Sequence, residues 1–173
     1  MSSAEGMADA GYALDDVYRR ERGRVFISGV QALVRLPIMQ RRLDRSRGLS
    51  TAGLVSGYRG SPLASYDQQL WKAAQALESE DIVFQPGLNE DLAATAIWGA
   101  QMHAAFGDVR VDGVFGIWYG KGPGVDRCGD VFRNANICGA SRLGGVIAVA
   151  GDDHGAQSSM RSEEHTSELQ SPI

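Results

Sequence analysis

The sequence predicts an α/β fold with three layers, in which a mainly parallel β-sheet carries helices on both faces. Apolar, strand-like runs alternate with helix-like runs along the 173 residues, of which 43% are hydrophobic. Most of the apolar runs end in a polar loop that contains glycine. Apolar strands joined by helices are typical of a parallel sheet that is covered on both sides. Right-handed crossovers then place the loops that follow the strands on one edge of the sheet.

The elements can be assigned in order along the chain. Strands are expected at 25–28, 51–56, 82–84, 111–118 and 145–150. Helices are expected at 29–47, 65–77, 91–106 and 125–138, with a kink or a split at Pro37 because proline breaks the helical hydrogen-bond pattern. The basic run 41–47 is interpreted as a solvated helix face.

The two ends of the chain differ from this pattern. Residues 1–13 are small and polar and are expected to form a disordered leader. The α/β domain is expected over 14–160, incomplete at its C-terminal end. Residues 161–171 match one reading frame of a common sequencing-adapter oligonucleotide, so 161–173 is interpreted as a non-native tail and excluded from the fold prediction.

Bulk composition excludes several classes of protein. The formal net charge is −4 and the pI is about 5.3, so no basic excess indicates nucleic acid. No apolar run is long enough to span a membrane, and no secretory signal is present, so we expect a cytoplasmic location. Cys128 and Cys138 lack the spacing of a zinc or iron–sulfur motif and are expected to be reduced, small core residues.

The stretch 85–92 contains the strongest candidate for a functional residue. Pro86 and Gly87 predict a turn, and Asn89 is a favourable N-cap. Glu90 would then lie in the first turn of a helix at the carboxyl end of a strand, which is where α/β sheets bind ligands. Two interpretations remain open: an acid that only stabilises its helix through the dipole, or an acid that faces a ligand.

Four loops are predicted to meet at the edge that carries Glu90, and this convergence favours the ligand-facing interpretation. They are 57–62, 85–90, 119–124 and 151–155. The glycine-rich loop around Lys121 is either a plain turn or an anion-binding loop. Asp152, Asp153 and His154 are interpreted as a polar cluster at the cleft and not as a metal site, because three successive residues rarely point at one ion. No Walker A pattern and no GxGxxG pattern occur in the sequence.

Five long segments, in this order, resemble the 2-oxoacid:ferredoxin oxidoreductases, and most closely the N-terminal part of the long bacterial indolepyruvate ferredoxin oxidoreductases. Together they cover roughly residues 14–160. The segments are GRVFISGVQALVRLP (23–37), TAGLVSGYRGSPLASYDQQLW (51–71), PGLNEDLAATAIWGAQ (86–101), DGVFGIWYGKGPGVDRCGDVFRNAN (112–136) and GGVIAVAGDDHGAQSS (144–159).

The resemblance implies a thiamine-diphosphate-binding fold, of which this chain would be the pyrimidine domain. Glu90 matches the family's catalytic glutamate, which hydrogen-bonds N1′ of the aminopyrimidine ring. Sharing a proton there favours the imino tautomer, which can take the proton from C2 of the thiazolium. Further cofactor contacts are expected from the residues that match the neighbouring loops, namely Gly57, Tyr58, Gly120, Lys121 and Gly122.

Substrate contacts are expected from residues that line the same edge, namely Arg59, Ser61, Asp153 and His154. Arg59 stands where much of the family has a proline, as in the long bacterial branch, and an arginine can pair with the carboxylate of a 2-oxo acid.

The full reaction implied by the resemblance is oxidative decarboxylation of an aryl 2-oxo acid to an acyl-CoA, with electrons passed to ferredoxin. The diphosphate and Mg²⁺ site and the 4Fe–4S clusters belong to other domains of the family, and their motifs do not occur in this sequence. The chain alone is therefore expected to be inactive, and the full-length enzyme to be a homodimer. The alternatives are an enzyme for a different 2-oxo acid, and a non-catalytic binding or assembly domain in which Glu90 only caps a helix.

Overall fold

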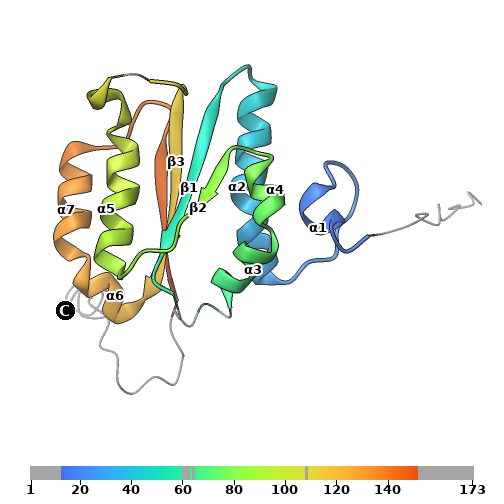
Figure 1. Cartoon of the computed structure of the whole chain (residues 1–173), viewed down its shortest axis with the longest axis horizontal. Helices are drawn as coiled ribbons and strands as arrows, with labels where there is room; N and C mark the ends of the chain where they lie inside the picture. The colour runs from blue at the N-terminus through green and yellow to red at the C-terminus, as the bar shows by residue number, and fades with distance from the viewer. Residues whose placement is uncertain (1–12, 60–62, 64, 108, 152–173) are drawn as a thin grey trace, which may run out of the picture.

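Four parallel strands form the centre of the molecule. The computed structural model describes residues 13–59, 63, 65–107 and 109–151. Within these ranges the strands are β1 (Thr51–Gly57), β2 (Ile82–Phe84), β3 (Gly113–Lys121) and β4 (Gly145–Gly151). They form one sheet in the order β2-β1-β3-β4, in which every pairing is parallel (Figure 1).

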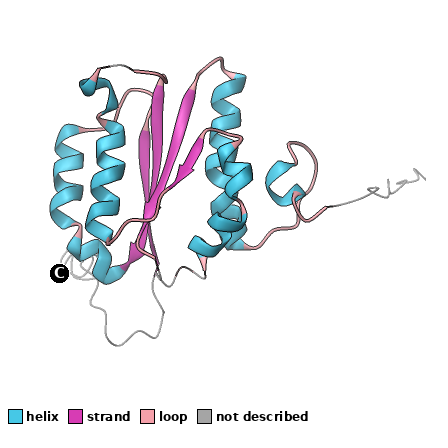
Figure 2. Ribbon diagram, viewed as in Figure 1, coloured by secondary structure: helices cyan, strands magenta, loops and turns pink. Residues whose placement is uncertain are grey.

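Helices cover both faces of this sheet, which confirms the predicted three-layer α/β fold. On one face lie α2 (Gly29–Ser46), α3 (Tyr66–Lys72) and α4 (Ala74–Glu78), with the short α1 (Asp16–Arg19) outside α2 (Figure 1). On the other face lie α5 (Glu90–Gln101) and α7 (Gly129–Cys138) (Figure 2). The 3-10 turn η1 (His103–Phe106) extends α5, and α6 (Gly122–Arg127) follows β3.

Each helical layer buries its own apolar core against the sheet. The core on the α2 side includes Val34, Ile38, Leu70 and Tyr119, all at most 1% exposed. The core on the α5 side is smaller and is centred on Trp118, which is fully buried and contacts Phe132 edge to face at 5.0 Å. Burial of these side chains is the main favourable term that holds the layers together.

The strand predicted at 25–28 is wrong, and this segment pairs with no other described strand. Its side chains do not enter the core, since Phe26 is 92% exposed. Ser28 instead caps α2, because its hydroxyl accepts a hydrogen bond from the backbone N–H of Gln31 while the Gln31 side chain accepts from the backbone N–H of Ser28. These two reciprocal hydrogen bonds form a capping box, so Ser28 is the N-cap of α2 and not part of a strand.

Several predicted boundaries also differ. Helix α2 continues through Pro37 without a split. The helix predicted at 65–77 is two helices that meet at Ala73, and the one predicted at 125–138 is interrupted at Cys128. Strand β3 begins and ends later than 111–118. The predictions for 1–12 and for 152–173, the tail among them, fall outside the described residues.

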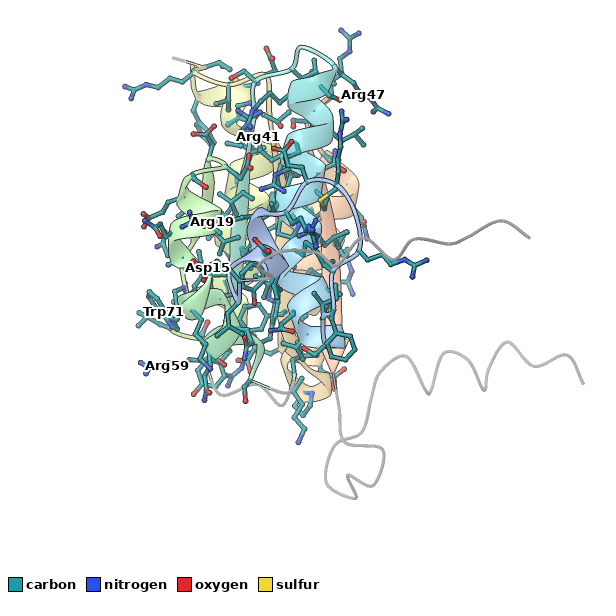
Figure 3. All side chains as sticks on the ribbon, turned by 90° about the vertical axis from the view of Figure 1, so that its right-hand side faces the viewer. Asp15, Arg19, Arg41, Arg47, Arg59 and Trp71 are labelled. Atoms are coloured by element: carbon teal, nitrogen blue, oxygen red, sulfur yellow. The ribbon has the colours of Figure 1, made fainter. Side chains whose placement is uncertain are left out.

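The interpretation of the basic run 41–47 as a solvated face holds for Arg45 and Arg47, which are exposed, but is wrong for Arg41 and Arg42. Arg41 is only 6% exposed, and its Nη2 lies 2.8 Å from Oδ2 of Asp81. Arg42 and Arg45 both pair with Glu80, at 2.7 and 2.6 Å. Figure 3 shows Arg47 projecting from the end of α2, whereas Arg41 lies against the body of the domain. The helical period turns part of this run inward, toward the acids that precede β2.

None of the helices in the described part of the chain is both long enough and apolar enough to cross a lipid bilayer.

Glu80 should make a measurable contribution to stability. Its side chain is 7% exposed and neutralises two arginines. We expect Glu80→Gln to lower the free energy of unfolding by about 2 kcal/mol, because it leaves a partly buried arginine unpaired. Glu78 is exposed, so Glu78→Gln is the matched control and should stay within about 0.5 kcal/mol of wild type. Urea denaturation measures both, and equal effects would contradict this role for Glu80.

Candidate functional site

The carboxyl ends of β1, β2 and β3 meet at one edge of the sheet. The ladder between β1 and β3 ends with Gly57 opposite Tyr119. Just beyond it, Tyr58 forms a parallel bridge with Gly87, and the N–H of Gly87 donates to the carbonyl of Gly57 at 3.0 Å. The loops that follow β1 and β2 are therefore tied together by backbone hydrogen bonds.

Gly57 is needed at this edge because the chains approach too closely for a side chain. A Cβ at this position would collide with the carbonyl oxygen of Tyr119 and with its ring. The ring of Tyr119 in turn meets Tyr66 edge to face at 5.1 Å. Burial raises the pKa of both hydroxyls far above the usual value, so they stay neutral and serve as packing groups.

Glu90 is the first residue of α5, and two contacts fix its position. The Asn89 side chain caps the helix by accepting from the N–H of Leu92 at 2.8 Å. The indole Nε1 of the buried Trp118 donates to the backbone carbonyl of Glu90 at 3.1 Å. The start of α5 is therefore held directly over the end of β3.

The carboxylate of Glu90 lies in a shielded position. Its side chain is 14% exposed, and Oε2 is 3.6 Å from Nη1 of Arg127, whose own side chain is 61% exposed. Gly124 lies close to the same side chain, where an added Cβ would be 2.6 Å from Cγ and 3.1 Å from Oε1 of Glu90. The first turn of α6 thus provides the room in which this carboxylate sits.

Cys128 shows how strongly this environment disfavours another negative charge. Burial raises the pKa of its thiol to about 12, the negative charges of Asp91 and Glu90 contribute to the rise, and Arg127 only partly opposes them. A thiol with such a pKa is a poor nucleophile at neutral pH, so Cys128 is a packing residue. Cys138, the other cysteine predicted to lie in the core, is exposed.

The structure places most of the predicted site residues at this edge. Gly57 ends β1, and Tyr58, 42% exposed, follows it. Arg59 is exposed in the next turn and lies at the lower, carboxyl end of the sheet in Figure 3. Gly120 and Lys121 end β3, and Gly122 begins α6. Ser61, Asp153 and His154 lie outside the described residues.

Three residues of the site are missed by sequence reasoning, namely Trp118, Gly124 and Arg127. In the sequence Trp118 is simply an apolar residue of a strand, and no pattern indicates that its indole N–H reaches across to α5. Gly124 lies in a visible glycine-rich loop, but its closeness to Glu90 depends on the tertiary fold. Arg127 becomes a neighbour of Glu90 only because α6 packs against α5.

In the described ranges, no three His, Cys, Asp or Glu side chains gather closely enough to hold a metal ion.

No protein-family model, curated protein or solved structure matches this chain. Its function must therefore be inferred from the geometry of the site together with the sequence resemblance.

Gly124 should be intolerant of a side chain. We expect Gly124→Ala to lower the free energy of unfolding by about 1–2 kcal/mol, because the new Cβ forces Glu90 or α6 to move. Gly99 lies in α5 with nothing within 4 Å of an added Cβ, so Gly99→Ala should raise stability by about 0.5–1 kcal/mol. Thermal or urea denaturation of the two variants tests the difference, and a stabilising Gly124→Ala would rule out the close contact.

The two cysteines should differ in reactivity. At a pH of about 8, iodoacetamide should label the exposed Cys138 and spare Cys128, because a thiol that is buried and has a raised pKa supplies very little thiolate. Mass spectrometry of the labelled peptides, with urea-unfolded protein as the control, measures this. Rapid labelling of Cys128 in the folded protein would show that the region around Glu90 is open to solvent.

Proposed function

We propose that this chain is the pyrimidine-binding part of a cytoplasmic, thiamine-diphosphate-dependent 2-oxoacid:ferredoxin oxidoreductase of the indolepyruvate type. The observation that carries the proposal is the shielded carboxylate of Glu90 at the start of α5, above the carboxyl end of β3. An acid in this position is what the aminopyrimidine ring of the cofactor requires.

The topology of the sheet supports a ligand site at this edge. The chain moves outward from β1 to β2 and then returns past β1 to β3 and β4. The direction therefore reverses between β1 and β3, and ligands of open α/β sheets bind at the carboxyl edge of such a switch point. Gly57 and Tyr119 end the ladder between the two strands concerned, and Trp118, next to Tyr119 in β3, contacts the first residue of α5.

The surroundings of Glu90 fit an aminopyrimidine. The only ion pair that the described residues make with its carboxylate is the 3.6 Å contact to Arg127, which is longer than a hydrogen bond and leaves the carboxylate able to accept from a ligand. Leu88 and Leu92, which flank Glu90 in sequence, are 85% and 51% exposed.

Each residue then has a defined task. Glu90 accepts the hydrogen bond from N1′ and holds the shared proton there, and its shielding from water strengthens that bond. Arg127 offsets the negative charge of Glu90 and Asp91. Trp118 and the Asn89 cap hold the helix so that the carboxylate need not reorient. When bound, thiamine diphosphate supplies the electron sink for decarboxylation of the 2-oxo acid.

The remaining parts of the proposal concern the substrate and the whole protein. The exposed Arg59 would pair with the substrate carboxylate, with Ser61, Asp153 and His154 as further contacts. Gly57, Tyr58, Gly120, Lys121 and Gly122 would line the cofactor. The diphosphate with Mg²⁺, the iron–sulfur clusters, coenzyme A and ferredoxin would be bound by other domains of a homodimeric enzyme.

The contact between Glu90 and Arg127 also favours an alternative function, that of a non-catalytic assembly domain. An ion pair between the first residue of α5 and the last residue of α6 can also be a purely structural link in a non-catalytic assembly domain. That alternative requires no ligand for the Glu90 carboxylate, so a binding measurement separates the two functions.

The test uses 4-amino-5-hydroxymethyl-2-methylpyrimidine, which is the ring of the cofactor without its diphosphate. We expect weak binding to this chain, with a Kd on the order of 1 mM. Glu90→Gln should weaken binding by about tenfold, or about 1.4 kcal/mol, because the amide cannot take the shared proton. Ligand-observed NMR titration measures the affinity.

Asp91→Asn is the matched control. Asp91 lies in the same helical turn, so its loss has a similar effect on the helix dipole and on the net charge. We expect this variant to bind the pyrimidine as the wild type does. Equal affinities for wild type and Glu90→Gln would favour the structural alternative instead.

A further inference from the structure

Two unpaired arginines lie at the amino edge of the sheet, which is the edge opposite Glu90. The segments that lead into β1, β3 and β4 form this edge, at the upper end of the sheet in Figure 1. Arg47 follows α2 and precedes β1, and Arg142 precedes β4. Neither side chain makes a hydrogen bond or an ion pair with a described residue, and both line one hollow. The whole chain has a net charge of −4, so the unpaired positive charge is a local feature of this edge.

The carboxylates that lie nearby are already engaged with other groups. Asp44 is buried, and its oxygens accept from the amide of Gln40 at 2.8 Å and from the hydroxyl of Thr51 at 2.7 Å. Oδ2 of Asp112 accepts from the backbone N–H of Ser50 at 2.7 Å. These hydrogen bonds tie α2 and the start of β3 to the start of β1, and they leave the two arginines without an acidic partner.

Arg142 also lines a second hollow, of about 380 Å³, at the same edge. Arg110, in the segment before β3, lines it as well, so two guanidinium groups border one space. Val109 and Val111 provide an apolar wall beside them. The hollow therefore combines positive charge with apolar surface, which is the usual composition of a site for a small anionic molecule.

Ser141 adds a hydroxyl group that lacks a partner. It lines the same hollow, and its Oγ is buried without a hydrogen bond to any described residue. A buried polar group without a partner costs free energy, so such groups are uncommon in folded proteins. A ligand oxygen in the hollow could supply the missing acceptor once the side chain turns toward it about χ1.

We propose that this hollow binds a phosphate monoester. The phosphate group lies between Arg110 and Arg142 and accepts from the hydroxyl of Ser141, and the organic part of the ester contacts Val109 and Val111. The proposal concerns the edge of the sheet that is distant from Glu90, so it does not depend on the proposed function.

The charge of the ligand follows from the pair of arginines. A phosphate monoester carries about −1.5 to −2 charges at neutral pH on one group, whereas a carboxylate carries a single charge. Its oxygens can accept two parallel hydrogen bonds from each guanidinium, a geometry that lysine cannot offer. The apolar wall favours an ester over inorganic phosphate, which has no organic part to contact the two valines.

The test is a titration of the full 173-residue chain with phenyl phosphate, followed by the amide chemical shifts in NMR spectra at constant ionic strength. We expect saturable shifts around Arg110 and Arg142, with a Kd on the order of 1 mM. Inorganic phosphate should bind about threefold or more weakly at the same place, because it cannot contact the apolar wall.

Three variants separate a site from a general effect of charge. Arg142→Gln should weaken binding of phenyl phosphate by about fivefold or more. Arg22→Gln removes the same charge from an exposed position before the start of α2, so it is the matched control and should bind as wild type does. Ser141→Ala should weaken binding by about two- to threefold without lowering stability in the absence of the ester, because the hydroxyl that it removes has no partner in the described protein.

The proposal fails on any of three results. The first is the absence of saturable shifts with phenyl phosphate. The second is an equal loss of affinity in Arg142→Gln and Arg22→Gln, because binding would then report only the net charge. The third is inorganic phosphate that binds as tightly as the ester, because the valine wall would then play no part. Circular dichroism confirms that each variant is folded.

Discussion

The parallel ladder between β1 and β3 is the constraint on which the rest of the molecule depends. Its register runs from Thr51 opposite Gly113 to Gly57 opposite Tyr119. This pair forms the middle of the sheet, so its two faces carry both cores, and its outer sides receive β2 and β4. Because the strands are parallel, both of their following loops leave at one edge. The site exists because β1 and β3 end side by side.

Rigidity at that edge comes from small residues and from a few directed contacts. Gly57 allows the ends of β1 and β3 to touch, and Gly124 allows α6 to pass close to Glu90. The indole N–H of Trp118 then joins the α5-side core to the first residue of α5. A carboxylate held in this way, with little exposure and a 3.6 Å contact to Arg127, could accept the hydrogen bond of the proposed aminopyrimidine without moving.

Sequence reasoning identifies the elements whose signal is local. The strands at 51–56, 82–84 and 145–150 and the start of a helix at Asn89 and Glu90 follow from apolar runs, glycine loops and a capping residue. The segment 25–28 has the same apolar character, but a strand also needs a neighbouring strand, and the described sheet consists of β2, β1, β3 and β4 alone. The inward pairing of Arg41 and the approach of Arg127 to Glu90 depend on residues distant in sequence, which no local pattern reports.

The central claim is that the Glu90 carboxylate meets N1′ of an aminopyrimidine. The most direct measurement is the ¹⁵N chemical shift of N1′ in a labelled aminopyrimidine bound to this chain, with wild type compared with Glu90→Gln. Sharing of the proton with Glu90 predicts a marked upfield shift of N1′ in the wild-type complex and its loss in the variant. A bound pyrimidine whose N1′ shift equals that of the free ring, or one that is shifted equally in both proteins, would contradict the account.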